Sequence, residues 1–464
     1  MRRPAFIALA AAFLGAAAVR ADAQTNFTTY VSVGDSLAAG FESGSLVETH
    51  QNRSVPALIA RQAGVQGFQQ PLVSEPGIPP ELTLVSLVPV PVIAPKAATA
   101  GAPKNLALAR PYNNLAVPGA TSVDALTRTT DAGGLHDLIL RGLGTQVQQA
   151  VALRPTAITL WIGNNDVLGA ALRGRAIDGV TLTPTATLLW IGNNDVLGAA
   201  LRGRAIDGVT LTPTATFRAT YGQIVAALKT TGAFIVAANL PDVTTIPFVT
   251  TIRPYVVNPT TGAPVLIGGA RVPLIGPSGS LPSTALVTLA ASTLLGQGIG
   301  IPTALGGTGA PLPDEVVLDP SEIAIIQDHV AANNQAIREI CGAANIPVLD
   351  VNGVLRELAT TGRHIGGITL NGAFLVGGVF SYDGIHPNDV GYALVANEFI
   401  RVINASGGSL PPVDLGAVLG VTGASAGGVS ASAQRPSSSE RVAFEFSMDA
   451  YANLLEAFPR LDRR

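Results

Sequence analysis

Five short apolar segments along the chain have the pattern of buried parallel strands. Each is rich in β-branched residues and lacks the polar alternation of a strand that faces water on one side. Glycine, proline or polar residues close to the ends of these segments would turn the chain. The segments are 28–33, 113–117, 157–162, 233–238 and 346–351.

Helical patterns lie between these predicted strands. The clearest covers 319–340, where Asp319 stands as an N-cap and Pro320 occupies the first turn. Two others cover 145–153 and 217–232. Alternation of strands and helices predicts a three-layer α/β/α fold with a parallel sheet. In such sheets ligands bind beyond the carboxyl ends of the strands.

Segments rich in proline and glycine interrupt this pattern. Two insertions, at about 69–110 and 248–318, are longer than ordinary connections. Loops of this length are usually lids, binding surfaces or mobile segments. The composition after residue 405 predicts a flexible tail over 406–464 that ends in a short amphipathic helix. The sequence therefore predicts one α/β domain over 24–405, followed by this tail.

A tandem duplication lies in the middle of the chain. Residues 160–187 are repeated letter for letter at 189–216. Solenoid architectures need several copies, so the two units compete for one place in the sheet. We expect the first copy to take that place, because a short turn connects it to the preceding helix and Ile158 suits a buried strand better than Thr187. The other copy would form an extra lobe.

The N-terminal residues have the form of a secretory signal peptide. Two arginines precede an apolar run of about fifteen residues, and an Ala-Asp-Ala sequence ends at Ala23. A membrane anchor is the weaker interpretation, because the run is short for a bilayer span and ends at Arg20. The sequence thus predicts cleavage after Ala23 and a secreted or periplasmic protein with no transmembrane span in its mature chain.

Composition narrows the classes of partner. The chain has 28 basic and 31 acidic residues, so it lacks the excess of positive charge that nucleic-acid binding requires. Charged residues make up only 13% of the chain. Cys341 is the single cysteine, which excludes an intrachain disulfide, and its apolar helical surroundings predict a buried core position.

Polar motifs follow strands or turns that would meet at one edge of the sheet. Ser36 lies in VGDSLAAG, Gly119 in NLAVPGAT and Asn165 in WIGNND. Near the C-terminus, DGIHPNDVGY places Asp383 and His386 three residues apart in a tight turn. A serine that attacks a carbonyl needs a base, a group that orients the base, and N–H donors for the developing oxyanion.

Each motif also has an ordinary structural interpretation. Gly-Asp-Ser is a common turn sequence, and His386 could be a buried or solvated histidine. Gly119 could serve only its turn, and Asn165 could merely stand at the start of a helix. We favour catalysis because the motifs occur in order at one sheet edge. His386 would take the serine proton and Asp383 would hold the imidazole.

Together the four motifs resemble the blocks of the SGNH, or GDSL, hydrolase family over roughly residues 28–404, the two insertions excluded. The resemblance implies a flavodoxin-like, five-stranded parallel sheet and hydrolysis of esters or thioesters through an acyl-enzyme, with no metal or other cofactor. It implies that Ser36 is the nucleophile, His386 the base and Asp383 its orienting group. The oxyanion donors would be the Ser36 and Gly119 backbone N–H groups and the Asn165 side-chain amide.

The doubled third block departs from the family pattern. Asn194 is equal to Asn165 by residue type and would be the oxyanion donor if the second copy occupied the site. The leading prediction is an exported esterase or lipase-like enzyme that acts on a small-molecule or lipid acyl ester. A carbohydrate O-deacetylase is the alternative within this class. A catalytically inactive surface or binding protein is the alternative outside it, supported by the doubled block and the long tail.

Overall fold

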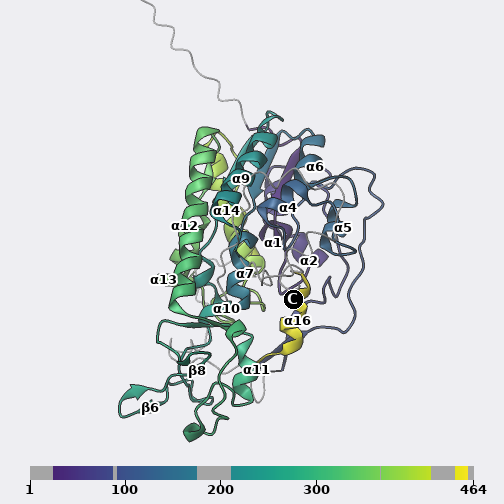
Figure 1. Ribbon diagram of the computed structural model, residues 1–464. Coiled ribbons are helices and arrows are strands. Elements are labelled where there is room, and N and C mark those ends of the chain that lie inside the picture. Colours follow the sequence, from purple (N-terminus) through teal and green to yellow (C-terminus); the bar gives the residue numbers. More distant parts are fainter. Residues whose placement is uncertain (1–24, 87–90, 175–210, 366, 420–444, 458–464) are drawn as a thin grey trace, which may run out of the picture.

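A parallel β-sheet forms the centre of the protein. The computed structural model describes residues 25–86, 91–174, 211–365, 367–419 and 445–457 (Figure 1). The predicted signal peptide and most of the second repeat copy lie outside these residues. The sheet has four strands in the order β1-β4-β5-β12. They are β1 (Tyr30–Gly34), β4 (Ala157–Trp161), β5 (Phe234–Ala238) and β12 (Val348–Leu349), and each neighbouring pair is parallel.

The expected fifth strand is reduced to a single β-bridge. Segment 113–117 runs beside β1, where Ser32 donates to the Asn113 carbonyl over 2.9 Å and accepts from the Leu115 N–H over 2.9 Å. The backbone N–H groups of Asn113 and Asn114 donate to the Gln69 carbonyl, and the Asn113 side chain donates to the Tyr30 carbonyl, so regular pairing does not extend to Tyr30. The prediction of five full strands was therefore wrong. The spatial order, with this segment outside β1, is nevertheless that of a flavodoxin-like sheet.

Strand β12 is also shorter than the apolar segment that predicted it. Helix α13 (Val351–Thr360) begins directly after the strand. The Asp350 side chain accepts a hydrogen bond from the Gly353 N–H and so caps this helix. An N-cap residue has non-helical backbone but starts the helical hydrogen bonds, which ends the strand at Leu349.

Helices cover both faces of the sheet, as the strand–helix alternation predicted. Side chains of alternate strand residues point to opposite faces: Val31 and Val33 pack against one layer and Tyr30 against the other. Cys341 is buried in the first layer, as expected. That layer contains α4 (Ser122–Thr127), α6 (Gln146–Ala152), α9 (Thr214–Lys229) and α12 (Pro320–Ala343), and the second contains α3 (Val55–Gln62) and α14 (Asp389–Ala405). Helices α9 and α12 lie side by side in Figure 1.

The first copy of the repeat supplies the strand in the sheet. Strand β4, whose last residues Leu160 and Trp161 begin this copy, pairs with β1 on one side and β5 on the other. Helix α7 (Asn165–Arg173) follows the strand within the same copy. Helix α9 starts at Thr214, in the last residues of the second copy. The expected choice between the two copies is therefore the one that this structure has.

The second insertion builds a lobe with its own small core. Val256, Leu274, Val287 and Leu312 are buried together in it. The lobe lies at the bottom of Figure 1, around the labels β6, β8 and α11. Its elements are α10 (Pro247–Thr250), β6 (Leu266–Ile267), β7 (Ala270–Arg271), β8 (Ile275–Gly276), β9 (Gly279–Ser280), β10 (Leu286–Val287), α11 (Ala291–Gly296) and β11 (Val317–Leu318).

Shorter elements connect these layers. The first insertion contains β2 (Leu82–Ser86) and β3 (Val92–Pro95), which pair in antiparallel fashion.

No helix in the described part of the chain combines the length and apolar character that crossing a bilayer requires. The remaining elements are α1 (Ser36–Ala39), α2 (Glu48–Gln51), α5 (Leu135–Leu140), β13 (Arg363–Ile365), β14 (Ile368–Leu370), α15 (Leu415–Val418), β15 (Glu445–Phe446) and α16 (Met448–Ala457), with 3-10 turns at Val243–Thr245, Thr303–Leu305 and Asp314–Val316.

The C-terminal segment docks between the two insertions. Strand β15 pairs with β3 of the first insertion. The Phe446 N–H donates to Ser292 Oγ of the second insertion over 2.7 Å, and the Phe446 ring lies 6.3 Å from that of Phe248. Helix α16 continues from this strand, and Tyr451 donates to the Leu172 carbonyl over 3.2 Å. The last described residues therefore hold three distant parts of the chain together.

This packing predicts that Phe446→Ala destabilises the protein. Phe446 is fully buried, so its truncation leaves a cavity where both insertions meet, and we expect the free energy of unfolding to fall by about 3–5 kcal/mol. Met448→Ala is the matched control, because the Met448 side chain is 51% exposed. Denaturant unfolding followed by circular dichroism measures both. Equal stability of the two variants would contradict the docking of this segment.

Candidate active site

Ser36 is held at the carboxyl end of β1 by a capped turn. It is the first residue of α1, and the Asp35 side chain accepts from the Leu37 N–H over 3.2 Å. Asp35 also accepts from the Asn164 backbone N–H over 3.2 Å and from its side-chain amide over 2.8 Å. Burial raises the pKa of Asp35 to about 7, although these hydrogen bonds oppose the shift. The turn after β1 is thus tied to the turn after β4.

The structure brings Ser36, His386 and Asp383 into one chain of contacts. Ser36 Oγ lies 2.8 Å from His386 Nε2, and His386 Nδ1 lies 2.8 Å from Asp383 Oδ2. All three residues are buried. Burial alone would raise the pKa of Asp383, but the neighbouring imidazole and the hydrogen bonds that the carboxylate accepts lower it. A serine hydroxyl bonded to an imidazole that faces a carboxylate is the arrangement of a serine hydrolase.

The carboxylate of Asp383 fixes the turn that carries His386. Its Oδ1 accepts from the backbone N–H groups of Ile385 and His386, both over 2.8 Å, and from Ser381 Oγ over 3.0 Å. Its Oδ2 accepts from the Gly44 N–H over 2.9 Å as well as facing the imidazole. Each carboxylate oxygen is therefore satisfied, so the buried charge has a fixed position.

Residues 41–45, here called the support loop, lie against this turn. The Phe41 ring meets the His386 ring edge-on, with centroids 5.0 Å apart. The Ser43 N–H donates to Ser381 Oγ over 3.0 Å. Tyr392 of α14 donates a hydrogen bond to the Phe41 carbonyl. Sequence reasoning missed the support loop, because it follows the serine motif without a motif of its own, and it assigned no role to Tyr392 at the end of the histidine motif.

The two predicted oxyanion residues lie at the same edge of the sheet. Gly119 follows segment 113–117 and has a φ of 78°, a left-handed conformation that glycine adopts without strain. Asn165 is the first residue of α7, and its amide donates to the Ala120 carbonyl over 2.9 Å. A side-chain amide has two N–H donors, so one remains for another acceptor. The third candidate, Asn194, lies outside the described residues.

Asp166 joins the turns that carry these donors. Its carboxylate accepts from the Ser122 N–H over 2.8 Å and from Ser122 Oγ over 2.7 Å. Burial raises the pKa of Asp166 to about 6, against the effect of the two Ser122 bonds. The starts of α4 and α7 are therefore locked together, next to Gly119 and Asn165.

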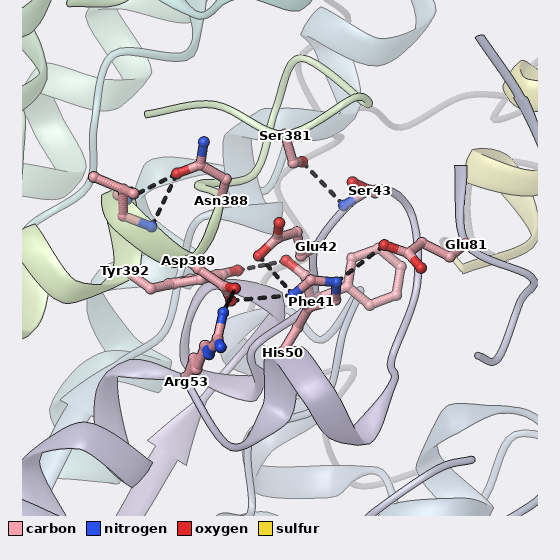
Figure 2. A network of polar contacts seen from close by, with 12 residues as sticks. Phe41, Glu42, Ser43, His50, Arg53, Glu81, Ser381, Asn388, Asp389 and Tyr392 are labelled. Carbon is pink, nitrogen blue, oxygen red and sulfur yellow. Dashed lines mark hydrogen bonds and ion pairs between the residues drawn. The ribbon is translucent and has the colours of Figure 1, made fainter. Parts of the chain in front are cut away.

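A second polar cluster includes Glu42 of the support loop (Figure 2). Potential metal-ligating atoms of Glu42, His50 and Asp389 lie within 4.8 Å of one another, and in this structure His50 forms an ion pair with each carboxylate. The sequence did not predict this cluster, because its members come from separate segments and share no motif. The sequence offered only a weak signal for this cluster: Glu42 closely follows one motif and Asp389 lies within another, in a chain with few charged residues.

Solved structures of several other proteins are similar to this chain at low sequence identity. The lipase/acylhydrolase from Enterococcus faecalis is 12% identical, with a TM-score of 0.32 over 83% of this chain and 98% of that chain. An extracellular lipase from Streptomyces rimosus is 15% identical, with a TM-score of 0.32 over 82% and 99%. An acetylxylan esterase from Geobacillus stearothermophilus, a catalytic mutant, is 11% identical, with a TM-score of 0.32 over 82% and 96%. None of the curated proteins matches this chain.

A family model decides the classification. The model of the GDSL-like lipase/acylhydrolases matches residues 30–399, which is most of the chain. This range contains Ser36, Gly119, Asn165, Asp383 and His386, in the order that the four motifs predicted. The chain therefore belongs to the GDSL-like lipase/acylhydrolase family and is an enzyme that hydrolyses ester bonds.

Proposed function

We propose that this protein is an exported serine hydrolase that cleaves carboxylic esters of acyl substrates through an acyl-enzyme on Ser36. The observation that carries the proposal is the continuous contact from Ser36 Oγ through the His386 imidazole to the Asp383 carboxylate, with both distances at 2.8 Å. The signal-peptide pattern of residues 1–23 supports export.

The proposed reaction begins with proton transfer from Ser36 Oγ to His386 Nε2 while Oγ attacks the ester carbonyl carbon. Asp383 holds the imidazole in orientation and stabilises its positive charge. The backbone N–H groups of Ser36 and Gly119 and the amide of Asn165 donate to the oxyanion. His386 then protonates the leaving alkoxide, and the acyl group stays on Ser36. Water, deprotonated by His386, hydrolyses this acyl-enzyme in a second, equivalent step.

Apolar surroundings favour an acyl chain as the bound part of the substrate. Phe41, next to His386, belongs to the same buried cluster as Leu82 of the first insertion and Phe248 and Leu289 of the second. The Phe248 N–H donates to the Gly384 carbonyl over 2.8 Å, so the second insertion reaches the turn of the catalytic histidine. We infer that apolar surroundings of this kind favour small-molecule or lipid acyl esters over polar substrates.

Substitution of Ser36 tests the reaction. Ser36→Ala removes the attacking oxygen, and we expect kcat for a p-nitrophenyl acyl ester to fall at least about 10⁴-fold. A fluorophosphonate probe should label the unmodified protein at Ser36 and leave the variant unlabelled, because only an activated serine reacts. An unmodified protein that is folded but neither labelled nor active would favour the catalytically inactive binding protein.

The oxyanion assignment is tested by a pair of matched substitutions. Asn165→Ala removes one oxyanion donor, so we expect kcat to fall about 10²–10³-fold with little change in KM. Asn194→Ala changes the same residue within an identical local sequence and should leave kcat unchanged. The reverse result would mean that the second copy supplies the donor.

A substrate panel tests the acyl-ester assignment. The apolar surroundings of His386 predict a higher kcat/KM for p-nitrophenyl butyrate and longer acyl esters than for acetylated oligosaccharides. The chain also has only two tryptophans for stacking on sugar rings, Trp161 and Trp190. Initial rates over a series of acyl chain lengths, at equal enzyme concentration, give the comparison. Faster deacetylation of the oligosaccharides would assign the enzyme to the carbohydrate O-deacetylases instead.

A further inference from the structure

His50 lies at the centre of an ionic cluster that the proposed reaction does not use. It belongs to the short helix α2, and Figure 2 shows carboxylates around its ring. Its Nδ1 lies 3.2 Å from Glu42 Oε2 and 3.1 Å from Asp389 Oδ1, and its Nε2 lies 3.0 Å from Glu81 Oε1. The three carboxylates come from the support loop, the first turn of α14 and the first insertion.

The contacts require a positively charged imidazole. Both ring nitrogens face carboxylate oxygens, and both must carry protons to donate to them. Burial alone would lower the pKa of His50, but its contacts with the carboxylates of Asp389, Glu42 and Glu81 outweigh burial and raise the pKa to about 12. Because the pKa is raised, the charge is present at neutral pH and is lost only as the pH rises through that value.

Glu42 depends on this charge more than the other two carboxylates do. Asp389 also pairs with Arg53, and Glu81 also pairs with Lys96. Glu42 Oε2 is buried, and in the described part of the chain its cationic neighbour is His50. Burial raises the pKa of Glu42 to about 7 even though His50 opposes the shift. Removal of the His50 charge would leave Glu42 facing Asp389 with no cation between them.

Both carboxylates that meet at His50 Nδ1 adjoin the catalytic groups. Glu42 stands in the support loop between Phe41, which packs on the His386 ring, and Ser43. The next residue, Gly44, donates to Asp383 Oδ2 over 2.9 Å. Asp389 follows His386 by three residues and begins α14. His50 therefore links the support loop to the segment that carries both Asp383 and His386.

We propose that His50 is a positioning residue for this active site: its imidazolium holds Glu42 and Asp389 together and so keeps the support loop against the turn of Asp383 and His386. This inference rests on the proposed function of the site. His50 does not touch the reacting atoms and acts through the loop. The charged or titratable groups around it are Glu42, Glu81, Asp389, Arg53, Lys96 and Tyr392.

Glu42, His50 and Asp389 are also residue types that bind divalent cations. The protonation of His50 and the charges around it argue against a metal here. Nδ1 would have to lose its proton to become a ligand. Asp389 and Glu81 already have cationic side chains as partners, which leaves little uncompensated negative charge for a metal. The proposal therefore commits to the protonated imidazole, and metal dependence becomes an outcome that would overturn it.

His50→Gln is the direct test. Without the imidazolium the Glu42 and Asp389 carboxylates repel each other, so we expect kcat to fall about 10–100-fold with KM within about twofold of the unmodified enzyme. Protonation of one carboxyl relieves this repulsion. The loss of kcat should thus be at least about fivefold smaller at pH 6 than at pH 8.5. A residue with only a general structural role would lower activity equally at both values.

Removal of the facing charge should rescue the variant. In the double variant His50→Gln, Glu42→Gln, a neutral amide replaces the carboxylate that lost its partner, and kcat should recover to within about fivefold of the unmodified enzyme at pH 8.5. This variant also keeps the test decisive if His50→Gln alone does not fold. Arg218→Gln is the matched control, because it removes a cation from an ion pair with Glu339 on the distant α9–α12 surface and should change neither kcat nor the pH dependence.

Thermal melting and fluorophosphonate labelling of each variant separate loss of folding from loss of positioning. A folded His50→Gln protein with unchanged kcat at both pH values would overturn the proposal. So would a double variant with no recovery, or inactivation of the unmodified enzyme by EDTA that Zn²⁺ or Ca²⁺ reverses. An unmodified enzyme that neither turns over esters nor takes the label would instead refute the proposed function itself.

Discussion

The burial of one negative charge is the constraint on which the active site depends. Asp383 has no exposed surface, and an unpaired carboxylate in such a place would cost several kcal/mol. It is stable there because four hydrogen bonds from Ser381, Ile385, His386 and Gly44 reach it in addition to its contact with the imidazole. Satisfying this charge also aligns the turn of His386 with a loop that is more than three hundred residues away in sequence.

The sheet aligns the turns on the opposite side of the site. Parallel strands end at a common edge, so the turns after β1, segment 113–117 and β4 meet there without any direct attraction between their catalytic side chains. Asp35 and Asp166 then fasten neighbouring turns to each other through Asn164 and Ser122. Buried carboxylates thus recur around the site as acceptors that join loops from separate strands.

Sequence reasoning found the parts of this site that local pattern determines. A strand followed by a polar turn located Ser36, and three-residue spacing in a tight turn located Asp383 and His386. The same reasoning overcounted strands, because an apolar run does not reveal that the Asn113 and Asn114 N–H groups will donate to the Gln69 carbonyl rather than extend the pairing with β1.

Sequence reasoning did not predict contacts between distant segments. His50 and Glu81 stand in no motif, and their partners are set by how an insertion folds back over the support loop. Tertiary packing, rather than local propensity, decides such positions.

The docking of β15 on β3 has a consequence for biosynthesis. Strand β3 is synthesised several hundred residues before its partner Phe446. The edge of β3 must remain without that partner while the residues between them are synthesised, and pairings of such long sequence separation form slowly. Docking of β15 on the two insertions therefore follows synthesis of every segment that carries a catalytic residue, which makes this docking a late step in maturation of the enzyme.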